Sequence, residues 1–124
     1  MNKEDYVNLE VAKLLKRKGF NELCLYFYTD DEDDTLWDAI DEMENINLGG
    51  NEFSAPTLYE AQKWLRSAKG LHVEVSYMSG DYWLYEILTI PNHDLIGLSD
   101  RENIRYMSYE YALQEGILEA LKLI

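Results

Sequence analysis

The sequence predicts a single α+β domain at residues 1–124, with a small antiparallel sheet of three to four strands and about three helices packed mainly on one face. The 124 residues, 47% of them hydrophobic, are enough for one domain with a buried core. Helical and strand-like hydrophobic spacings also alternate along the chain, in the order helix, strand, acidic segment, helix, hairpin, helix. This order favours helices layered on an antiparallel sheet.

The N-terminal part predicts a helix followed by a strand. Asn8 is a good N-cap for a helix that places Val11 and Leu15 on one face, and Gly19 suits the left-handed position after the helix end. The next run, "LCLYFYT" at residues 23–29, is apolar or aromatic at nearly every position. We expect such a strand to be central in a sheet or covered on both faces.

Residues 30–52 have the weakest pattern in the chain. Leu36, Ile40 and Met43 have some helical spacing, but repulsion between the many acidic side chains opposes a stable helix. We therefore expect a mobile acidic connection at about 30–52, with about two helical turns in it.

A second helix and a hairpin have clear local signals. Thr57 and Glu60 match the capping box, in which each residue satisfies a backbone N–H group of the other. Residues 71–77 then alternate between apolar and polar side chains, and residues 82–90 are rich in strand formers. Because Gly80 provides a turn signal between these two runs, we predict an antiparallel hairpin.

The C-terminal part predicts irregular surface after Pro91, a short strand at 104–107 and a last helix capped by Ser108. Gly116 falls on the apolar face of this helix. Glycine inside a helix costs about 1 kcal/mol relative to alanine. We therefore expect a neighbouring element to pack too close to Gly116 for a side chain.

The net charge of −13 is concentrated in one third of the chain. No Lys or Arg occurs from Gly19 to Gln62, where twelve acidic residues fall. The rest of the chain has twelve acidic and eleven basic residues, a balance of −1. This distribution argues against direct nucleic-acid binding, which needs clustered Lys and Arg, and favours a basic protein surface as the partner.

The acidic run itself is the predicted partner-binding segment. "TDDEDDTLWDAIDEMEN", residues 29–45, has nine carboxylates and no basic residue. Its Trp37 belongs to a residue type that is enriched at binding hot spots, so we assign partner binding to Asp33, Asp34, Trp37 and Asp38. The alternative is that Trp37 packs on the core while the acidic residues keep the protein soluble.

Calcium binding is another alternative for the same run. Counted from Asp30, acidic residues occupy positions 1, 3, 5, 9 and 12 of an EF-hand-like loop. These candidate ligands are Asp30, Glu32, Asp34, Asp38 and Asp41. Thr35 replaces the glycine expected at position 6, and Asp41 replaces the longer glutamate expected at position 12.

The other reactive residues form no catalytic or cofactor pattern. Cys24, His72 and His93 lack the paired spacing of a zinc site, and Cys24 lies among apolar residues where a free cysteine is usually buried. We therefore expect no enzyme activity and no cofactor.

The aromatic residues of the strands are expected to pack in the core or across strands, rather than to stack on nucleic-acid bases. They are Tyr26, Phe27, Tyr28, Tyr82, Trp83 and Tyr85. Together with the apolar C-terminal helix, they offer enough apolar surface for a homo-oligomer, which is a further alternative.

The expected location is the cytoplasm. A single cysteine cannot form an internal disulfide, which suits a reducing compartment. The N-terminus lacks the apolar stretch of a secretory signal, and no apolar run is long enough to cross a membrane.

Four blocks resemble a group of small uncharacterised proteins encoded by phages and mobile elements of Bacteroides and relatives. The blocks are "VNLEVAKLLKRKGF", "SAPTLYEAQKWLRSAKGLHVEV", "YWLYEI" and "MSYEYALQEGILEALKLI". The resemblance covers about two thirds of the chain and implies an intracellular accessory protein of a mobile element. It implies no activity and no functional residue, because none is established for the group.

Overall fold

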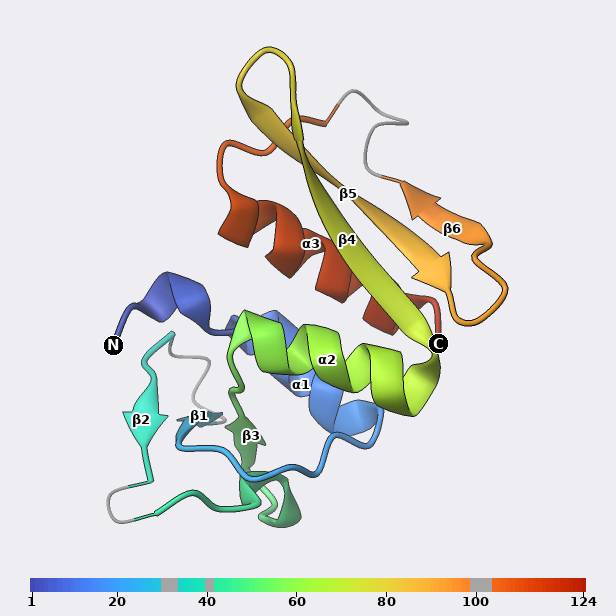
Figure 1. Ribbon diagram of the computed structural model, residues 1–124. Coiled ribbons are helices and arrows are strands. Elements are labelled where there is room, and N and C mark those ends of the chain that lie inside the picture. Colours follow the sequence, from blue (N-terminus) through green and yellow to red (C-terminus); the bar gives the residue numbers. More distant parts are fainter. Residues whose placement is uncertain (30–33, 40–41, 99–103) are drawn as a thin grey trace.

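The computed structural model describes residues 1–29, 34–39, 42–98 and 104–124. The predicted α+β class is confirmed: in these described residues, three α-helices are combined with two small three-stranded antiparallel sheets (Figure 1). The strands are thus divided between two sheets, where the sequence predicted one. Within the described residues, none of the helices is long and apolar enough to cross a membrane.

The larger sheet has the order β4-β5-β6. Strands β4 (Leu71–Met78) and β5 (Tyr82–Thr89) form the predicted hairpin and pair along eight residues each. Strand β6 (Leu95–Leu98) lies where the sequence predicted irregular surface. Gly97 allows this approach, since a Cβ there would lie 2.7 Å from Cδ1 of Ile87 on β5.

The strand predicted at 104–107 is reduced to a single bridge. Tyr106 pairs with Trp83 of β5 through two backbone hydrogen bonds of 2.8 and 3.1 Å. Helix α3 (Tyr109–Lys122) then begins after Ser108, whose side chain accepts a hydrogen bond from the backbone N–H of Tyr111 as predicted.

Helices α2 (Leu58–Lys69) and α3 cover one face of the hairpin. The capping box of α2 is confirmed, with both hydrogen bonds between Thr57 and Glu60 present. The close packing expected at Gly116 is confirmed too, because a Cβ there would lie 2.5 Å from Val73 Cγ1 and 3.0 Å from Tyr85 Cγ.

Helix α1 (Leu9–Arg17) packs on α3 and on the second sheet. The predicted N-cap is present, since Asn8 accepts a hydrogen bond of 2.9 Å from the backbone N–H of Val11. One continuous hydrophobic core joins the helices and both sheets. Among its most deeply buried residues are Leu15, Phe20, Tyr28, Leu65, Ile87, Ile117 and Leu121.

The smaller sheet has the order β2-β1-β3, with β1 (Tyr26–Thr29) in the predicted central place. Its neighbours are short: β2 (Trp37–Asp38) pairs over two residues and β3 (Glu52–Ser54) over three. Residues 37–38 are thus extended rather than helical, because pairing with β1 satisfies their backbone. Helical structure in the described residues of 30–52 is limited to the 3₁₀ helix at Ile46–Leu48. Ile40 and Asp41 lie outside the described residues, and the predicted mobility of 30–52 stays a prediction.

Lys16 of α1 holds the connection that leads into β3. Its Nζ donates hydrogen bonds to three backbone carbonyls, at 2.7 Å (Gly49), 3.2 Å (Gly50) and 2.9 Å (Glu52). Residues just before this connection form a short 3₁₀ helix, η2 (Ile46–Leu48). The Lys16 side chain therefore provides hydrogen bonds that fix residues 49–52, where strand pairing is short.

Two further side chains tie the smaller sheet to the body. The hydroxyl of Tyr28 donates a buried hydrogen bond of 2.8 Å to the carbonyl of Val7. Asn47 donates to the carbonyl of Phe20 and accepts from the backbone N–H of Ser54, both at 2.8 Å. We call these contacts and those of Lys16 the polar tethers.

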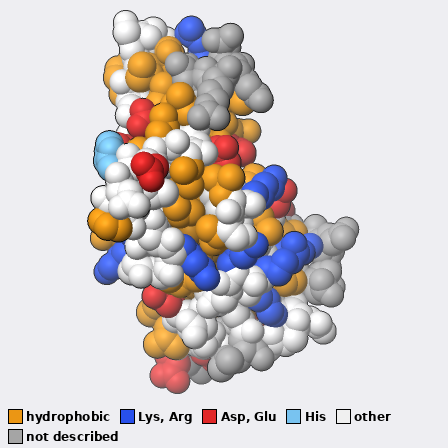
Figure 2. Space-filling model, turned by 90° about the vertical axis from the view of Figure 1, so that its right-hand side faces the viewer, with side chains coloured by type: hydrophobic (Ala, Val, Ile, Leu, Met, Phe, Trp, Pro, Cys, Tyr) orange, Lys and Arg blue, Asp and Glu red, His pale blue; other side chains and the backbone are white. Residues whose placement is uncertain are grey.

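The three α-helices end on the same side of the molecule (Figure 1). Their last turns carry Lys16 and Arg17 in α1, Arg66 and Lys69 in α2, and Lys122 in α3. Figure 2 shows Lys and Arg side chains gathered across the middle of this side. Such residues complement the negative ends of the helix dipoles.

Candidate functional site

The predicted partner-binding residues that the structure describes lie at the surface. Half of the surface of Trp37 is exposed, so this side chain is not part of the buried core. That its covered half only fixes the segment, while the acidic residues keep the protein soluble, stays an alternative. Asp38 is exposed beside it on β2, an edge strand of the smaller sheet. Asp33 lies outside the described residues.

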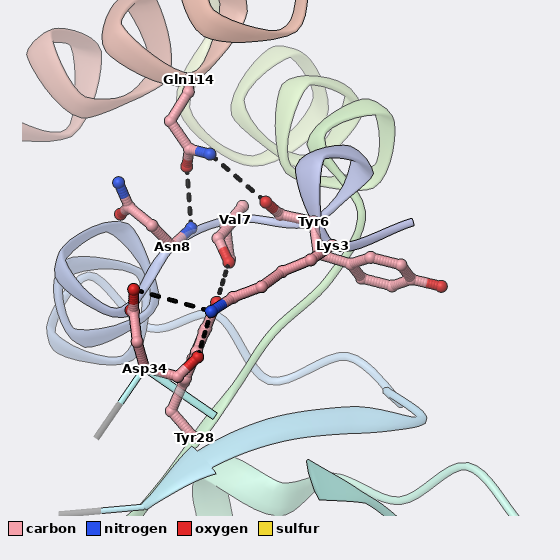
Figure 3. A network of polar contacts seen from close by, with 7 residues as sticks. All are labelled: Lys3, Tyr6, Val7, Asn8, Tyr28, Asp34 and Gln114. Carbon is pink, nitrogen blue, oxygen red and sulfur yellow. Dashed lines mark hydrogen bonds and ion pairs between the residues drawn. The ribbon is translucent and has the colours of Figure 1, made fainter. Parts of the chain in front are cut away.

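Asp34 lies beside η1 (Lys3–Asp5), a short 3₁₀ helix at the N-terminus. Its carboxylate is 3.6 Å from Nζ of Lys3, which also donates a hydrogen bond to the Asp34 carbonyl (Figure 3). Both side chains are more than half exposed, so the pair adds at most about 1 kcal/mol to stability. Asp34 therefore stays available at the surface.

A surface hollow connects Asp34 to α1. This α1 hollow has a volume of about 470 Å³ and is lined by Asn8, Leu9, Glu10, Lys13 and Asp34. The acidic run thus meets an acidic residue of the first helix, which lies far from it in the sequence.

A second hollow continues from Asn8 to α3. This α3 hollow, of about 270 Å³, has three carboxylates in its lining. The lining residues are Glu4, Asn8, Ser108, Glu110, Tyr111, Gln114 and Glu115. We call the two adjoining hollows, with the carboxylates of Glu4, Glu10, Asp34, Glu110 and Glu115, the acidic groove.

Gln114 fixes the floor of the acidic groove. Its side-chain oxygen accepts a hydrogen bond of 2.9 Å from the backbone N–H of Asn8, and its nitrogen donates one of 3.3 Å to the carbonyl of Tyr6 (Figure 3). These bonds hold the start of α1 against α3. The acidic side chains of the two helices are therefore kept at a fixed separation.

Five carboxylates and Lys13 are the charged groups that line the acidic groove. Burial, and then the negative charge of Glu10, raise the pKa of the Glu115 carboxyl above its usual range, against an opposing effect of Lys122. A positively charged group placed there would oppose the effect of Glu10, because an opposite charge stabilises the ionised carboxylate. An Arg or Lys side chain of a partner is one such group.

Most of this groove was missed by the sequence analysis. Glu4, Glu10, Glu110 and Glu115 lie outside the acidic third of the chain, where acidic and basic residues nearly balance, and each one alone is typical of a solvated helix. The two sides meet through Asn8 and Gln114, which are 106 residues apart. No local pattern signals such a contact.

The calcium alternative involves a few described residues only. Asp30, Glu32 and Asp41 lie outside them, while Asp34 and Asp38 are exposed. An EF-hand loop leads into a helix, whereas Asp38 lies in strand β2. In the ranges that the structure describes, no three His, Cys, Asp or Glu residues are grouped to hold a metal ion. Calcium binding stays a prediction, which a calorimetric Ca²⁺ titration would test.

Cys24 and the two histidines lie in three different segments of the fold. Cys24 is buried beside the smaller sheet, where its backbone pairs with Glu44. Burial raises the pKa of its thiol to about 12, so the thiol is protonated at neutral pH and is a poor nucleophile. His72 lies on β4, and His93 lies in the turn between β5 and β6.

The aromatic residues are divided between core and surface. Tyr28 and Tyr85 are buried, as expected for packing residues. Other rings continue outward from the hairpin: the ring centres of Tyr77 and Trp83 are 5.0 Å apart, and those of Trp83 and Tyr109 are 5.5 Å apart. This side of the molecule thus exposes aromatic surface near the start of α3.

Comparison with known proteins yields no relative: no family model, curated protein or solved structure matches this chain.

Proposed function

We propose that this protein is a non-enzymatic binding protein whose acidic groove and Trp37 dock onto a basic surface of a partner protein. The main support is the meeting of five carboxylates from four separate segments in the acidic groove. Only the Asp34 carboxylate belongs to the acidic run, so the fold adds charge to a surface that was already acidic.

Each part has a distinct physical role in this proposal. The nine carboxylates of residues 29–45 attract a cationic partner over a distance comparable to the Debye length, about 8 Å at physiological salt. The acidic groove takes up individual Lys or Arg side chains at short range. Trp37 supplies apolar area that contact with the partner can bury.

The biological setting belongs to the same proposal. The resemblance to proteins of phages and mobile elements would make this an accessory protein that acts in the cytoplasm of a bacterium. A basic host or element-encoded protein is a suitable partner in that setting.

The test is a quantitative pull-down from a bacterial lysate with two matched double variants. Asp34→Lys with Asp38→Lys reverses two charges on the proposed surface. Glu74→Lys with Glu86→Lys reverses two charges on a cross-strand pair of the hairpin, so it changes net charge equally.

We expect basic proteins captured by the wild type to be lost with the first variant and retained with the second. Capture should also weaken as salt is raised, because screening reduces electrostatic attraction. Equal loss in both variants would mean that only net charge matters. Unchanged capture in the first variant would overturn the proposed surface.

A further inference from the structure

An apolar hollow adjoins the acidic groove at the start of α3. It has a volume of about 440 Å³ and is lined by Ile104, Arg105, Tyr106, Met107, Ser108 and Tyr111. Met107 is 78% exposed and Tyr111 is 58% exposed, so apolar side chains line a surface open to solvent. Ser108 and Tyr111 also line the α3 hollow, which makes the apolar and acidic hollows direct neighbours.

The backbone around this apolar hollow is well fixed. Tyr106 is bonded to Trp83 of β5, and Ser108 caps the first turn of α3. The rings of Tyr106 and Tyr111 are stacked, with centres 5.3 Å apart. A surface held in this way needs little ordering when a ligand binds, which favours affinity.

The charges around the hollow are also defined. Glu110 and Glu115 lie on its acidic side, across Ser108 and Tyr111. The guanidinium of Arg105, the basic lining residue, lies over the ring of Tyr82 at 4.3 Å from its centre. Its positive charge thus makes a cation–π contact with a residue of the hairpin.

We propose that the apolar hollow and the α3 hollow together dock a partner segment in which a large apolar side chain lies next to Lys or Arg. The apolar side chain packs among Tyr106, Met107 and Tyr111, and the basic one reaches Glu110 and Glu115. Methionine and tyrosine suit this task because both are enriched at protein interfaces. The inference rests on the proposed function. It adds a preference for those basic segments that carry a large apolar side chain next to Lys or Arg.

The test uses three short capped peptides, which contain Trp-Arg, Ala-Arg or Trp-Glu and are otherwise identical. Each is titrated into the ¹⁵N-labelled full chain, and amide chemical shifts are followed by NMR. We expect the Trp-Arg peptide to bind most tightly and to shift signals of residues 104–111 and 115. The Ala-Arg peptide should shift only amide signals of the acidic groove. The Trp-Glu peptide should bind most weakly of the three.

Two variants separate the halves of the site. Met107→Ser removes apolar area from a side chain that is mostly exposed, so the fold should be retained. We expect it to raise the dissociation constant of the Trp-Arg peptide about fivefold, which corresponds to about 1 kcal/mol. The dissociation constant of the Ala-Arg peptide should not change. Glu115→Gln should weaken the binding of both Arg peptides and leave the binding of the Trp-Glu peptide unchanged.

The outcomes distinguish this inference from the proposed function. If Trp-Arg and Ala-Arg bind equally and Met107→Ser has no effect, the apolar hollow plays no part, while binding of cations by the acidic groove still stands. If neither Arg peptide shifts the acidic groove, both proposals fail. The same signals are also followed while the protein is concentrated without any peptide. If the amide signals of residues 104–111 shift, a second copy of the chain occupies this surface, and that result would also overturn the inference.

Discussion

The two sheets of this protein are stabilised in different ways. Strands β4 and β5 pair along eight residues, and helices α2 and α3 bury one of their faces. In the smaller sheet, β1 pairs with two neighbours over two and three residues, and the polar tethers complete its attachment. Long strand pairing and apolar burial hold the first region, whereas the second adds hydrogen bonds from a few side chains to a smaller share of the same core.

This difference relates to where the charge lies. The described part of the acidic run borders the smaller sheet, whose edge strand β2 exposes Trp37 and Asp38. Charged residues can vary there at little cost to the main core, because few of them contribute to its packing. Three predictions test this separation of stability from charge.

The largest effect is expected at the contact between α3 and the hairpin. Gly116→Ala places a Cβ 2.5 Å from Val73 and should lower the free energy of unfolding by about 2 kcal/mol, despite the better helix propensity of alanine. Urea denaturation measures this change. Gly50→Ala is the control, since nothing lies within 4 Å of a Cβ there. Equal stability of the two variants would show that the hairpin and α3 can move apart freely.

A second effect concerns Tyr28 and high pH. Burial, and then the charge of Asp34, raise the pKa of its hydroxyl to about 12. The folded protein then holds this proton more tightly than the unfolded chain, whose tyrosines titrate near 10. The contribution of Tyr28 to stability is therefore complete below about pH 10 and is lost as the pH rises toward 12.

The variant Tyr28→Phe isolates this contribution. It removes the hydrogen bond to Val7 and should cost about 1 kcal/mol at neutral pH. It should also make the decline of stability between pH 10 and 12 shallower, as measured by urea denaturation at each pH. Tyr59→Phe, at an exposed tyrosine, is the control and should leave both quantities unchanged. An identical alkaline decline in Tyr28→Phe and the wild type would contradict the prediction.

The smallest effect should be local to the second sheet. Lys16→Met keeps most of the apolar stem but removes the hydrogen bonds to three carbonyls. Hydrogen exchange should become faster for residues 26–29 and 52–54 and stay slow for 71–89, with a loss of global stability below about 1 kcal/mol. Lys13→Met is the matched control, because Lys13 also lies over the Phe53 ring. Uniformly faster exchange would mean that the two sheets open together.

The sequence predicted those features that depend on neighbouring residues in the chain. The capping box at Thr57 and the alternation along 71–77 act over a few positions, so both were recognised. Gly116 was recognised because its cost in a helix needs compensation by close packing. The exposure of Trp37 was left open, since a tryptophan in an acidic segment suits both a binding surface and a contact with the core.

The missed features depend on contacts between distant residues. Strand β2 exists because Trp37 pairs with Phe27, and its own two residues have no strand pattern. Strand β6 depends on the space that Gly97 leaves for Ile87. The acidic groove needs α1 and α3 to meet before its carboxylates share one surface. Single-sequence reasoning had no signal for any of these pairings.

The common direction of the three helices has one more consequence. Their C-terminal ends carry Lys and Arg on one side, while residues 34–39 of the acidic run lie toward the other (Figure 1). The described charges are therefore distributed unevenly between two sides of the molecule, in addition to its net charge of −13. An approaching cationic protein experiences a torque that turns the acidic side toward it before any atoms touch. Rotational alignment of this kind raises the share of collisions that lead to binding, and added salt should abolish the advantage.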